Sequence, residues 1–183
     1  MKKLIRTYLF LALVSGTIIF FDQLTKTWIR QTLLLGESFA PIAWLDPPLR
    51  IVHWYNTGVA LGLFQDAGTI LAVLAFLVSL GIIYYYPRVP AADWTLRLAM
   101  ALQLGGAVGN LIDRITIGHV TDFIAVGSFP VFNVADSSIT VGVFVLILGV
   151  WLQEKREKAQ RQRNQEQDHL TSGSISEFRE ANE

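Results

Sequence analysis

Long apolar segments dominate the pattern of hydrophobic and polar positions along the chain. They cover residues 4–22, 68–86, 96–112 and 134–152. Each approaches the ~20 residues that a helix needs to cross a bilayer. The last one must begin near Asn133, because the apolar run over residues 139–152 has only 14 residues. The pattern therefore predicts an all-α integral membrane protein with four transmembrane helices.

The connection between the first two segments is long and irregular. Residues 27–67 are interrupted by Gly36, Pro41 and the pair Pro47-Pro48, so they do not form another span. Within this connection, residues 49–55 have the β-branched and aromatic content of a strand. We therefore expect a small extracytoplasmic β-containing segment between the first two membrane helices.

The two ends of the chain are interpreted from their charge pattern. The first apolar segment follows Lys2, Lys3 and Arg6 and so also fits a secretory signal peptide. It lacks a convincing small-residue cleavage site and continues into polar residues at helical spacing, so we interpret it as the first membrane helix. Residues 154–183 are polar and of mixed charge. They predict a disordered cytoplasmic tail after a membrane domain of residues 1–153.

Composition and charge agree with a membrane protein. The chain has 52% hydrophobic and 16% charged residues, with a mean hydropathy of +0.42. A formal net charge of zero gives no reason to expect nucleic acid, and the lack of cysteine excludes thiol chemistry. Eleven Lys and Arg residues lie on the side of the termini and four on the other side, or five against four without the tail. The positive-inside rule therefore predicts cytoplasmic termini.

Two carboxylates lie where the third and fourth segments meet on the outer side. Asp122 and Asp136 flank an almost wholly apolar link, and Asp136 falls in the first turn of a membrane helix. A carboxylate at such a position is costly and usually functional. Two carboxylates that share a site cannot both ionise cheaply, so one keeps a proton while the other acts as a base. Such a pair can activate water for amide hydrolysis.

Other polar residues near the pair are candidates for supporting it. They are Asn110, Asp113, Arg114 and Asn133. The asparagines could hold the carboxyls or a substrate backbone, and Arg114 could offset nearby negative charge. Alternatively, Asp113 and Arg114 form a helix-end ion pair and the asparagines are caps. Asp22 and Lys26 share a helix face; they either form a surface ion pair or point into the same cavity as the carboxylates.

In the residues described above and the sequence around them, the chain resembles the lipoprotein signal peptidases (signal peptidase II), four-span aspartyl proteases of the bacterial inner membrane. The resemblance covers roughly residues 4–153. Its motifs are Asp22-Gln23-Leu24-Thr25-Lys26, Asn56-Thr57-Gly58-Val59-Ala60-Leu61-Gly62, Gly105-Gly106-Ala107-Val108-Gly109-Asn110-Leu111-Ile112-Asp113-Arg114, Val120-Thr121-Asp122-Phe123 and Phe132-Asn133-Val134-Ala135-Asp136-Ser137. The resemblance implies that Asp122 and Asp136 are the catalytic dyad. It also implies that the site is lined or braced by Asn56, Asn110, Arg114 and Asn133.

The resemblance further implies a substrate and a location. The substrate is a prolipoprotein whose cysteine carries a diacylglyceryl group, cleaved on the amino side of that cysteine. The site is expected near the outer face of the bacterial inner membrane, with membrane lipids as further partners and no obligate protein partner. The histidines, His53, His119 and His169, lack the spacing of metal ligands, so we predict neither a metal nor a cofactor.

Two other classes of protein remain as alternatives. A proton-coupled transporter would use Asp122 and Asp136 as proton carriers, and it predicts acidic residues at several depths of the membrane. Here the carboxylates cluster at one face. A non-catalytic assembly subunit would use Gly105 and Gly109, which have the small-xxx-small spacing of closely packed helices. That class leaves the polar cluster unexplained.

Overall fold

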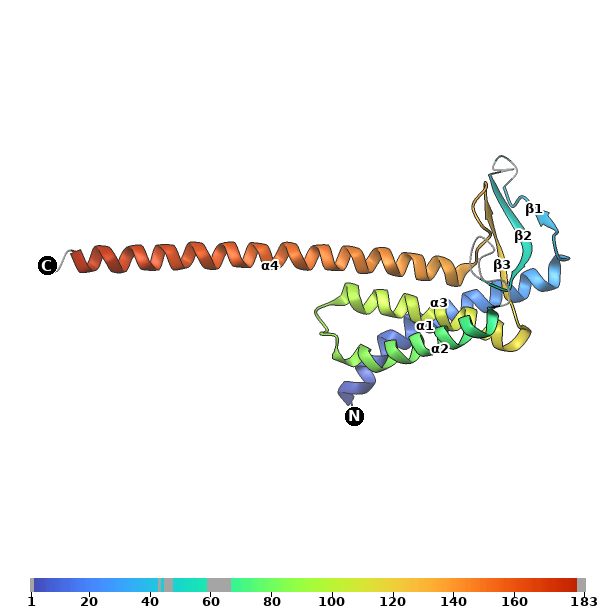
Figure 1. Cartoon of the computed structure of the whole chain (residues 1–183), viewed down its shortest axis with the longest axis horizontal. Coiled ribbons are helices and arrows are strands. Elements are labelled where there is room, and N and C mark those ends of the chain that lie inside the picture. The colour runs from blue at the N-terminus through green and yellow to red at the C-terminus, as the bar shows by residue number, and fades with distance from the viewer. Residues whose placement is uncertain (1, 43, 45–47, 59–66, 181–183) are drawn as a thin grey trace. The chain divides into compact units, whose positions relative to one another are not determined.

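The fold consists of long helices and one small sheet. The computed structural model of the chain describes residues 2–42, 44, 48–58 and 67–180. Among these residues, four helices are long and apolar enough to cross a membrane (Figure 1). They are α1 (Lys2–Thr32), α2 (Gly68–Tyr85), α3 (Trp94–Ile117) and α4 (Val134–Glu180), with a short 3-10 turn, η3 (Tyr86–Arg88), after α2. The predicted fold class is confirmed.

The chain divides into two compact units, Met1–Leu146 and Ile147–Glu183. The second unit continues α4 through residues that the sequence predicts to be disordered, and the structure keeps them helical to Glu180. Its exposed residues are rich in Glu, Lys, Gln and Arg, which favour helix, and Lys158 pairs with Glu154 one turn away at 3.9 Å. The division into a membrane domain of residues 1–153 and a cytoplasmic tail stays a prediction.

Two helices, α1 and α3, also continue beyond the C-terminal ends of the segments predicted for them. α1 runs to Thr32, so residues 27–32 belong to the helix and not to the connection that follows it. α3 runs to Ile117 and ends at Gly118, whose φ of 80° is the left-handed conformation that closes many helices. Both extensions carry polar side chains past the apolar runs that predicted the helices.

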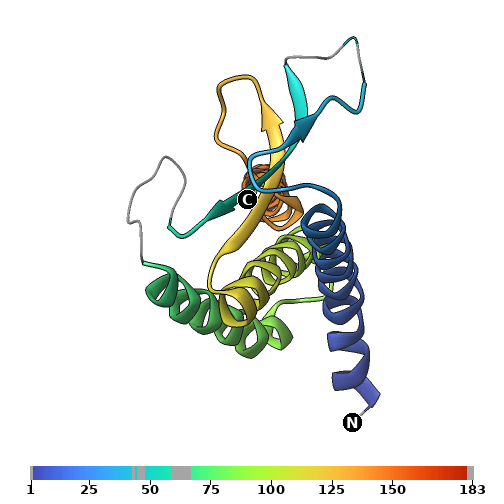
Figure 2. The same cartoon turned by 90° about the vertical axis from the view of Figure 1, so that its right-hand side faces the viewer.

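The sheet has three antiparallel strands in the order β1 (Ser38–Phe39), β2 (Leu49–Asn56) and β3 (Val120–Val126). β1 and β2 lie in the predicted β-containing segment, but β3 comes from the connection between α3 and α4, where no strand was predicted. Figure 2 shows β3, in yellow, leading from the end of α3 into the connection before α4. Trp54 of β2 pairs with Asp122 of β3. The sheet therefore fixes the position of one candidate carboxylate.

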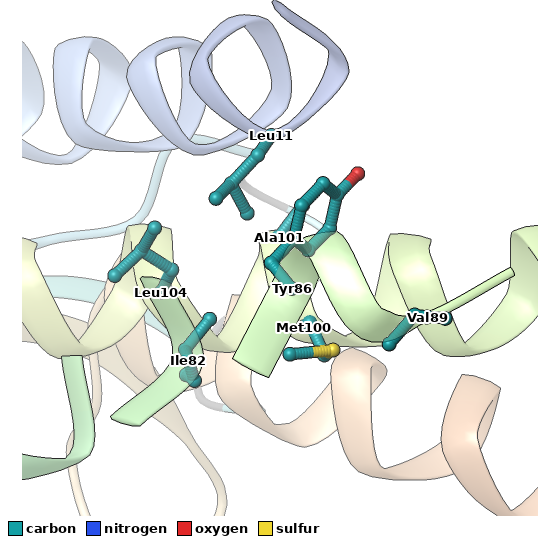
Figure 3. Close-up of a cluster of buried hydrophobic side chains, with 7 residues drawn as sticks. All are labelled: Leu11, Ile82, Tyr86, Val89, Met100, Ala101 and Leu104. Atoms are coloured by element: carbon teal, nitrogen blue, oxygen red, sulfur yellow. The ribbon is translucent and has the colours of Figure 1, made fainter. Parts of the chain in front are cut away.

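A cluster of buried apolar side chains joins the first three helices at the end where α2 connects to α3 (Figure 3). Its members are Leu11, Ile82, Tyr86, Val89, Met100, Ala101 and Leu104, here called the apolar cluster. Many large apolar side chains on the outer helix faces are exposed, such as Leu13 and Phe76. A protein with lipid around it shows this pattern, because its outer surface contacts hydrocarbon.

Glycines of α3 allow the helices to approach closely at the other end. A Cβ atom at Gly105 would lie 2.7 Å from Cβ of Ile18 in α1, and one at Gly109 would lie 2.7 Å from Oδ2 of Asp22. A Cβ atom at Gly106 would collide with the backbone oxygen of Ala135 in α4. The small-xxx-small spacing of Gly105 and Gly109 thus corresponds to close helix packing. It brings α1 and the start of α4 against the same stretch of α3.

Candidate active site

The first turn of α4 is closed by its own polar side chains. The backbone N–H of Asp136 donates to Oδ1 of Asn133 at 2.9 Å, and the N–H of Asn133 donates to Oδ2 of Asp136 at 3.3 Å. This reciprocal pair is a capping box with aspartate in the acidic position. The N–H of Ala135 donates to Oδ1 of Asp22 at 2.9 Å. Asn133 is therefore a cap, as the alternative interpretation expected, and Asp136 is held at a helix N-terminus. The same interpretation is wrong for Asn110, which lies in the interior of α3.

Asn133 also connects the two candidate carboxylates. Its side-chain Nδ2 donates to Oδ1 of Asp122 at 2.7 Å and lies 3.2 Å from Oδ1 of Asn110. Asn110 in turn donates from Nδ2 to Oδ1 of Asp136 at 2.8 Å. The side chain of Asn56, at the end of β2, forms a further hydrogen bond to Asp122. Side chains from β2, β3, α3 and α4 thus form one hydrogen-bonded network around both carboxylates.

Both carboxylates line a cavity of about 690 Å³, a volume typical of a ligand site. Its polar lining comes mainly from Asn56, Asn110, Arg114, Asp122 and Asp136. Its apolar walls include Leu71, Val120, Phe129, Val131, Phe132, Ile139 and Val141. The cavity therefore suits a largely apolar ligand, which would lie next to the two carboxylates.

Arg114 faces the carboxylate pair. It lines the same cavity as Asp122 and Asp136. Its Nε atom is buried and has no hydrogen-bond partner within the part of the chain that the structure describes. Arg114 therefore lies beside both carboxylates with an N–H donor unpaired among the described residues, and its role in offsetting negative charge stays a prediction.

The position of Asp122 in the sheet changes its acidity. Only 2% of its surface is exposed. Burial raises the pKa of Asp122, and the charge of Asp136 raises it further, while hydrogen bonds from Asn133 and Asn56 oppose the shift; the result is about 7. A carboxyl group that keeps its proton near neutral pH is what a pair with one acid and one base requires.

A second polar cluster lies next to the pair. Nζ of Lys26 lies 2.8 Å from Oδ2 of Asp22 and 3.3 Å from Oδ2 of Asp113, and it donates to Oδ1 of Asn110 at 2.9 Å. The side chains of Asp22 and Lys26 are fully buried, so they are not a surface ion pair. Neither of them lines the cavity, so the second interpretation is also wrong. They act on the site only through neighbours.

Asp113 belongs to this second cluster and not to a pair with Arg114. Its carboxylate accepts from the backbone N–H of Thr121 at 3.0 Å and lies 3.5 Å from NH1 of Arg30. Asp22, Lys26, Arg30 and Asp113 are here called the buried ion cluster. The interpretation of Asp113 and Arg114 as a helix-end ion pair is therefore wrong. Asp113, in α3, instead contacts Lys26 and Arg30 of α1 and the backbone of Thr121 in β3.

Three residues of these networks were assigned no role from the sequence: Gln23, Arg30 and Thr121. Arg30 donates to Oγ1 of Thr121 at 3.0 Å, and Nε2 of Gln23 donates to Asp22 and to the backbone oxygen of Gly109. The spacing of four between Asp22, Lys26 and Arg30 places them on one helix face, and this signal could have identified Arg30. Thr121 gave no such signal, since its contacts depend on the pairing of β3. Motif residues 59–62 lie outside the described residues.

Fold and site together define a multi-pass membrane protein with two hydrogen-bonded carboxylates in an apolar cavity. The family model for signal peptidase (SPase) II matches residues 14–152. The chain is 38% identical over 153 residues to the lipoprotein signal peptidase of Halalkalibacterium halodurans, covering 81% of this chain and 96% of that protein. It is 33% identical over 142 residues to that of Staphylococcus aureus, covering 75% and 85%.

A solved structure agrees with these relatives. It is described as a bacterial membrane enzyme, and its TM-score is 0.73 at 31% identity over 79% of this chain and 88% of that one. The chain belongs to the signal peptidase II family and is a multi-pass bacterial membrane protease. The predicted resemblance is confirmed. The predicted residues that line the cavity are Asn56, Asn110, Arg114, Asp122 and Asp136, and Asn133 connects the two carboxylates. Asp22, Lys26 and Asp113 belong instead to the buried ion cluster, and the roles of all these residues stay predictions.

Proposed function

We propose that this protein is an aspartyl endopeptidase that removes the signal peptide from diacylglyceryl-modified prolipoproteins. Cleavage falls on the amino side of the lipidated cysteine. The observation that carries the proposal is the pair Asp122 and Asp136, which are joined through Asn133 and both line a largely apolar cavity. The relatives are named lipoprotein signal peptidases, which fits a substrate of this kind.

The two carboxylates take different roles in this mechanism. Asp136 lines the cavity and accepts hydrogen bonds from Asn110 and from the backbone N–H of Asn133, which fix the position of its carboxylate. Asp122 keeps its proton because burial raises its pKa to about 7. Asp136 therefore acts as the base and Asp122 as the acid.

The reaction adds one water molecule across the scissile amide. Asp136 takes a proton from the water molecule while the water oxygen attacks the carbonyl carbon. At the same time Asp122 donates its proton to the carbonyl oxygen. When the tetrahedral intermediate breaks the C–N bond, the proton held by Asp136 goes to the leaving nitrogen and Asp122 regains its own. The products are the carboxylic acid of the signal peptide, which releases its proton to water, and the free amine of the lipidated cysteine. The charge of Arg114 offsets the negative charge of the pair during these steps.

The apolar walls of the cavity suit a substrate anchored by acyl chains. Each buried methylene contributes ~0.8 kcal/mol, so chains that stay in the bilayer can hold the scissile bond at a fixed depth. Recognition then requires small residues around the cleavage site and few polar contacts. The polar residues of the cavity remain available for chemistry.

The decisive experiment replaces each carboxylate by its amide. Asp122→Asn and Asp136→Asn should each abolish cleavage of a lipidated precursor in a purified assay, while precursor binding persists because the apolar walls are unchanged. The double variant should be little worse than either single variant, since both residues serve one proton transfer. Asp113→Asn is the matched control and should keep partial activity. If either dyad variant keeps more than about a tenth of wild-type turnover, that residue is not a catalytic carboxylate.

We also propose that both termini are cytoplasmic and that the site lies near the outer face. Lys26 and Arg30 lie within α1 and contact Asp113, so they are not free loop charges, which strengthens the charge argument. The sheet lies at the end of the helices away from the connection of α2 to α3 (Figure 1). A single cysteine at exposed Ser128 should react with an impermeant reagent from outside, and one at exposed Ala91 only from inside. The reverse labelling would overturn this orientation.

A further inference from the structure

We propose that Lys26 is a positioning residue that fixes the side-chain amide of Asn110 and thereby the hydrogen bonds of the catalytic pair. The inference rests on the proposed function, because it assigns Lys26 a part in that reaction. Lys26 cannot touch a substrate directly. Its side chain is fully buried, and it is not among the residues that line the cavity.

The contacts of Lys26 use all of its donors. A lysine ammonium has three N–H donors and no acceptor. Its three partners are Oδ2 of Asp22 at 2.8 Å, Oδ2 of Asp113 at 3.3 Å and Oδ1 of Asn110 at 2.9 Å. Since the ammonium can only donate, Asn110 must turn its carbonyl oxygen towards Lys26.

This requirement decides what Asn110 presents to the catalytic pair. With its oxygen on Lys26, its NH₂ group donates to Oδ1 of Asp136 at 2.8 Å. The opposite orientation would place NH₂ against the ammonium and the carbonyl oxygen against the carboxylate, which are two repulsive contacts in a buried site. Lys26 therefore keeps a donor directed at Asp136.

The same orientation reaches the second carboxylate through Asn133. Its Nδ2 lies 3.2 Å from Oδ1 of Asn110 and donates to Oδ1 of Asp122 at 2.7 Å. A reversed Asn110 would place two NH₂ groups against each other and disturb this bond. The side-chain NH₂ groups of Asn110 and Asn133, which donate to the two carboxylates, thus both depend on the ammonium of Lys26.

The ion cluster sets the design of the test, because removing Lys26 alone leaves the charges of Asp22 and Asp113 unbalanced in a buried site. Lys26→Met is therefore combined with Asp22→Asn, which removes one charge of each sign. The asparagine keeps an oxygen that can accept from the N–H of Ala135. The stem of methionine fills much of the space of the lysine.

Arg30 provides the matched control. It lies one turn further along α1 and contacts the same Asp113, but it donates to Thr121 and not to Asn110. Arg30→Met combined with Asp22→Asn makes the same change in charge as the Lys26 variant. It leaves the contact between Lys26 and Asn110 intact. The reference for both variants is Asp22→Asn alone.

With a lipidated precursor as substrate, the Lys26 double variant should lose on the order of 10- to 100-fold in kcat, the effect of one lost charge-assisted hydrogen bond. Its KM should stay within about twofold of the Asp22→Asn reference, because the cavity lining is unchanged. The Arg30 control should keep kcat within about threefold of the same reference. An unchanged kcat in the Lys26 variant, or an equal loss in the control, would overturn the assignment. So would a Lys26 variant that fails to fold while the control folds.

A double-mutant cycle with Asn110→Ala separates positioning from stability. If Lys26 acts through Asn110, its replacement should cost less than about threefold in kcat once Asn110 is gone. Losses that multiply would show that Lys26 acts independently of Asn110. Wild type and Asp136→Asn are assayed beside these variants. An inactive wild type or an active Asp136→Asn would refute the proposed function, whereas the cycle judges the role of Lys26 alone.

Discussion

The two ends of the helix bundle in Met1–Leu146 are held together by different forces. At the connection of α2 to α3, the apolar cluster fills space with side chains such as Leu104 and Met100. At the opposite end, α1, α3 and α4 meet through named hydrogen bonds and ion pairs. Apolar side chains gain only packing contacts in a membrane, since lipid is as apolar as they are. The apolar end therefore only holds the helices together. The polar end also holds individual side-chain atoms in fixed positions through hydrogen bonds and ion pairs.

The largest effect should come from a methyl group added at the polar end. In Gly109→Ala the new Cβ would lie 2.7 Å from Oδ2 of Asp22 and 3.3 Å from Cβ of Ala135. Because the carboxylate or the start of α4 must move, we expect a loss of about 1–3 kcal/mol in stability and more than tenfold in turnover. Thermal unfolding in detergent and precursor cleavage measure the two effects.

Gly16→Ala is the control for that change. Gly16 also lies in a helix, but apart from its chain neighbours and the backbone of its own helix no described atom lies within 4 Å of a Cβ placed there. Its replacement should leave turnover unchanged and could raise stability by up to ~1 kcal/mol through helix propensity. Wild-type behaviour of Gly109→Ala would contradict the close packing that this comparison depends on.

The next largest effect should be on the pH dependence of kcat/KM, which is governed by Asp122 at the polar end. Asp122 holds its proton up to about pH 7, so kcat/KM should fall about tenfold per pH unit above that value as the acid is lost. Asp113→Asn should have lower activity with the same inflection. Activity that stays level or rises to pH 9 would exclude Asp122 as the acid.

The same shift predicts a slope in stability. The pKa of Asp122 is raised in the folded protein from 3.8 to about 7, so the folded state binds more protons than the unfolded state between these values. The free energy of unfolding should therefore decrease as pH rises from about 4 to about 7. Asp122→Asn should lose this part of the slope, and denaturation at several pH values measures it.

The smallest effect should come from the apolar end. Tyr86 is fully buried, and its hydroxyl has no hydrogen-bond partner in the described part of the chain. Tyr86→Phe keeps the ring, which stacks on Tyr8 with a centroid distance of 6.1 Å. We expect unchanged turnover and a stability change between zero and a gain of about 1 kcal/mol, since no bond is lost. A clear loss of stability would show that the hydroxyl does have a partner.

The four membrane helices could be predicted because each contains a long apolar run, and the run of the last helix, 14 residues over 139–152, required an earlier start near Asn133. Their ends could not, since α1 continues past its apolar run through Asp22, Lys26 and Arg30. These residues are tolerated in a buried helix because α3 and α4 supply their partners. Similarly, the composition of residues 49–55 predicted β2, whereas β3 becomes a strand by pairing with β2.

The sequence by itself determined the membrane class, the close packing at Gly105 and Gly109, and the candidate carboxylates Asp122 and Asp136. These follow from local composition and spacing, which need no knowledge of distant residues. Only the tertiary structure decided that Asn133 joins the two carboxylates and that Lys26 lies behind Asn110. A hydrogen bond depends on distance and direction between atoms from different elements, and spacing along the chain does not specify either.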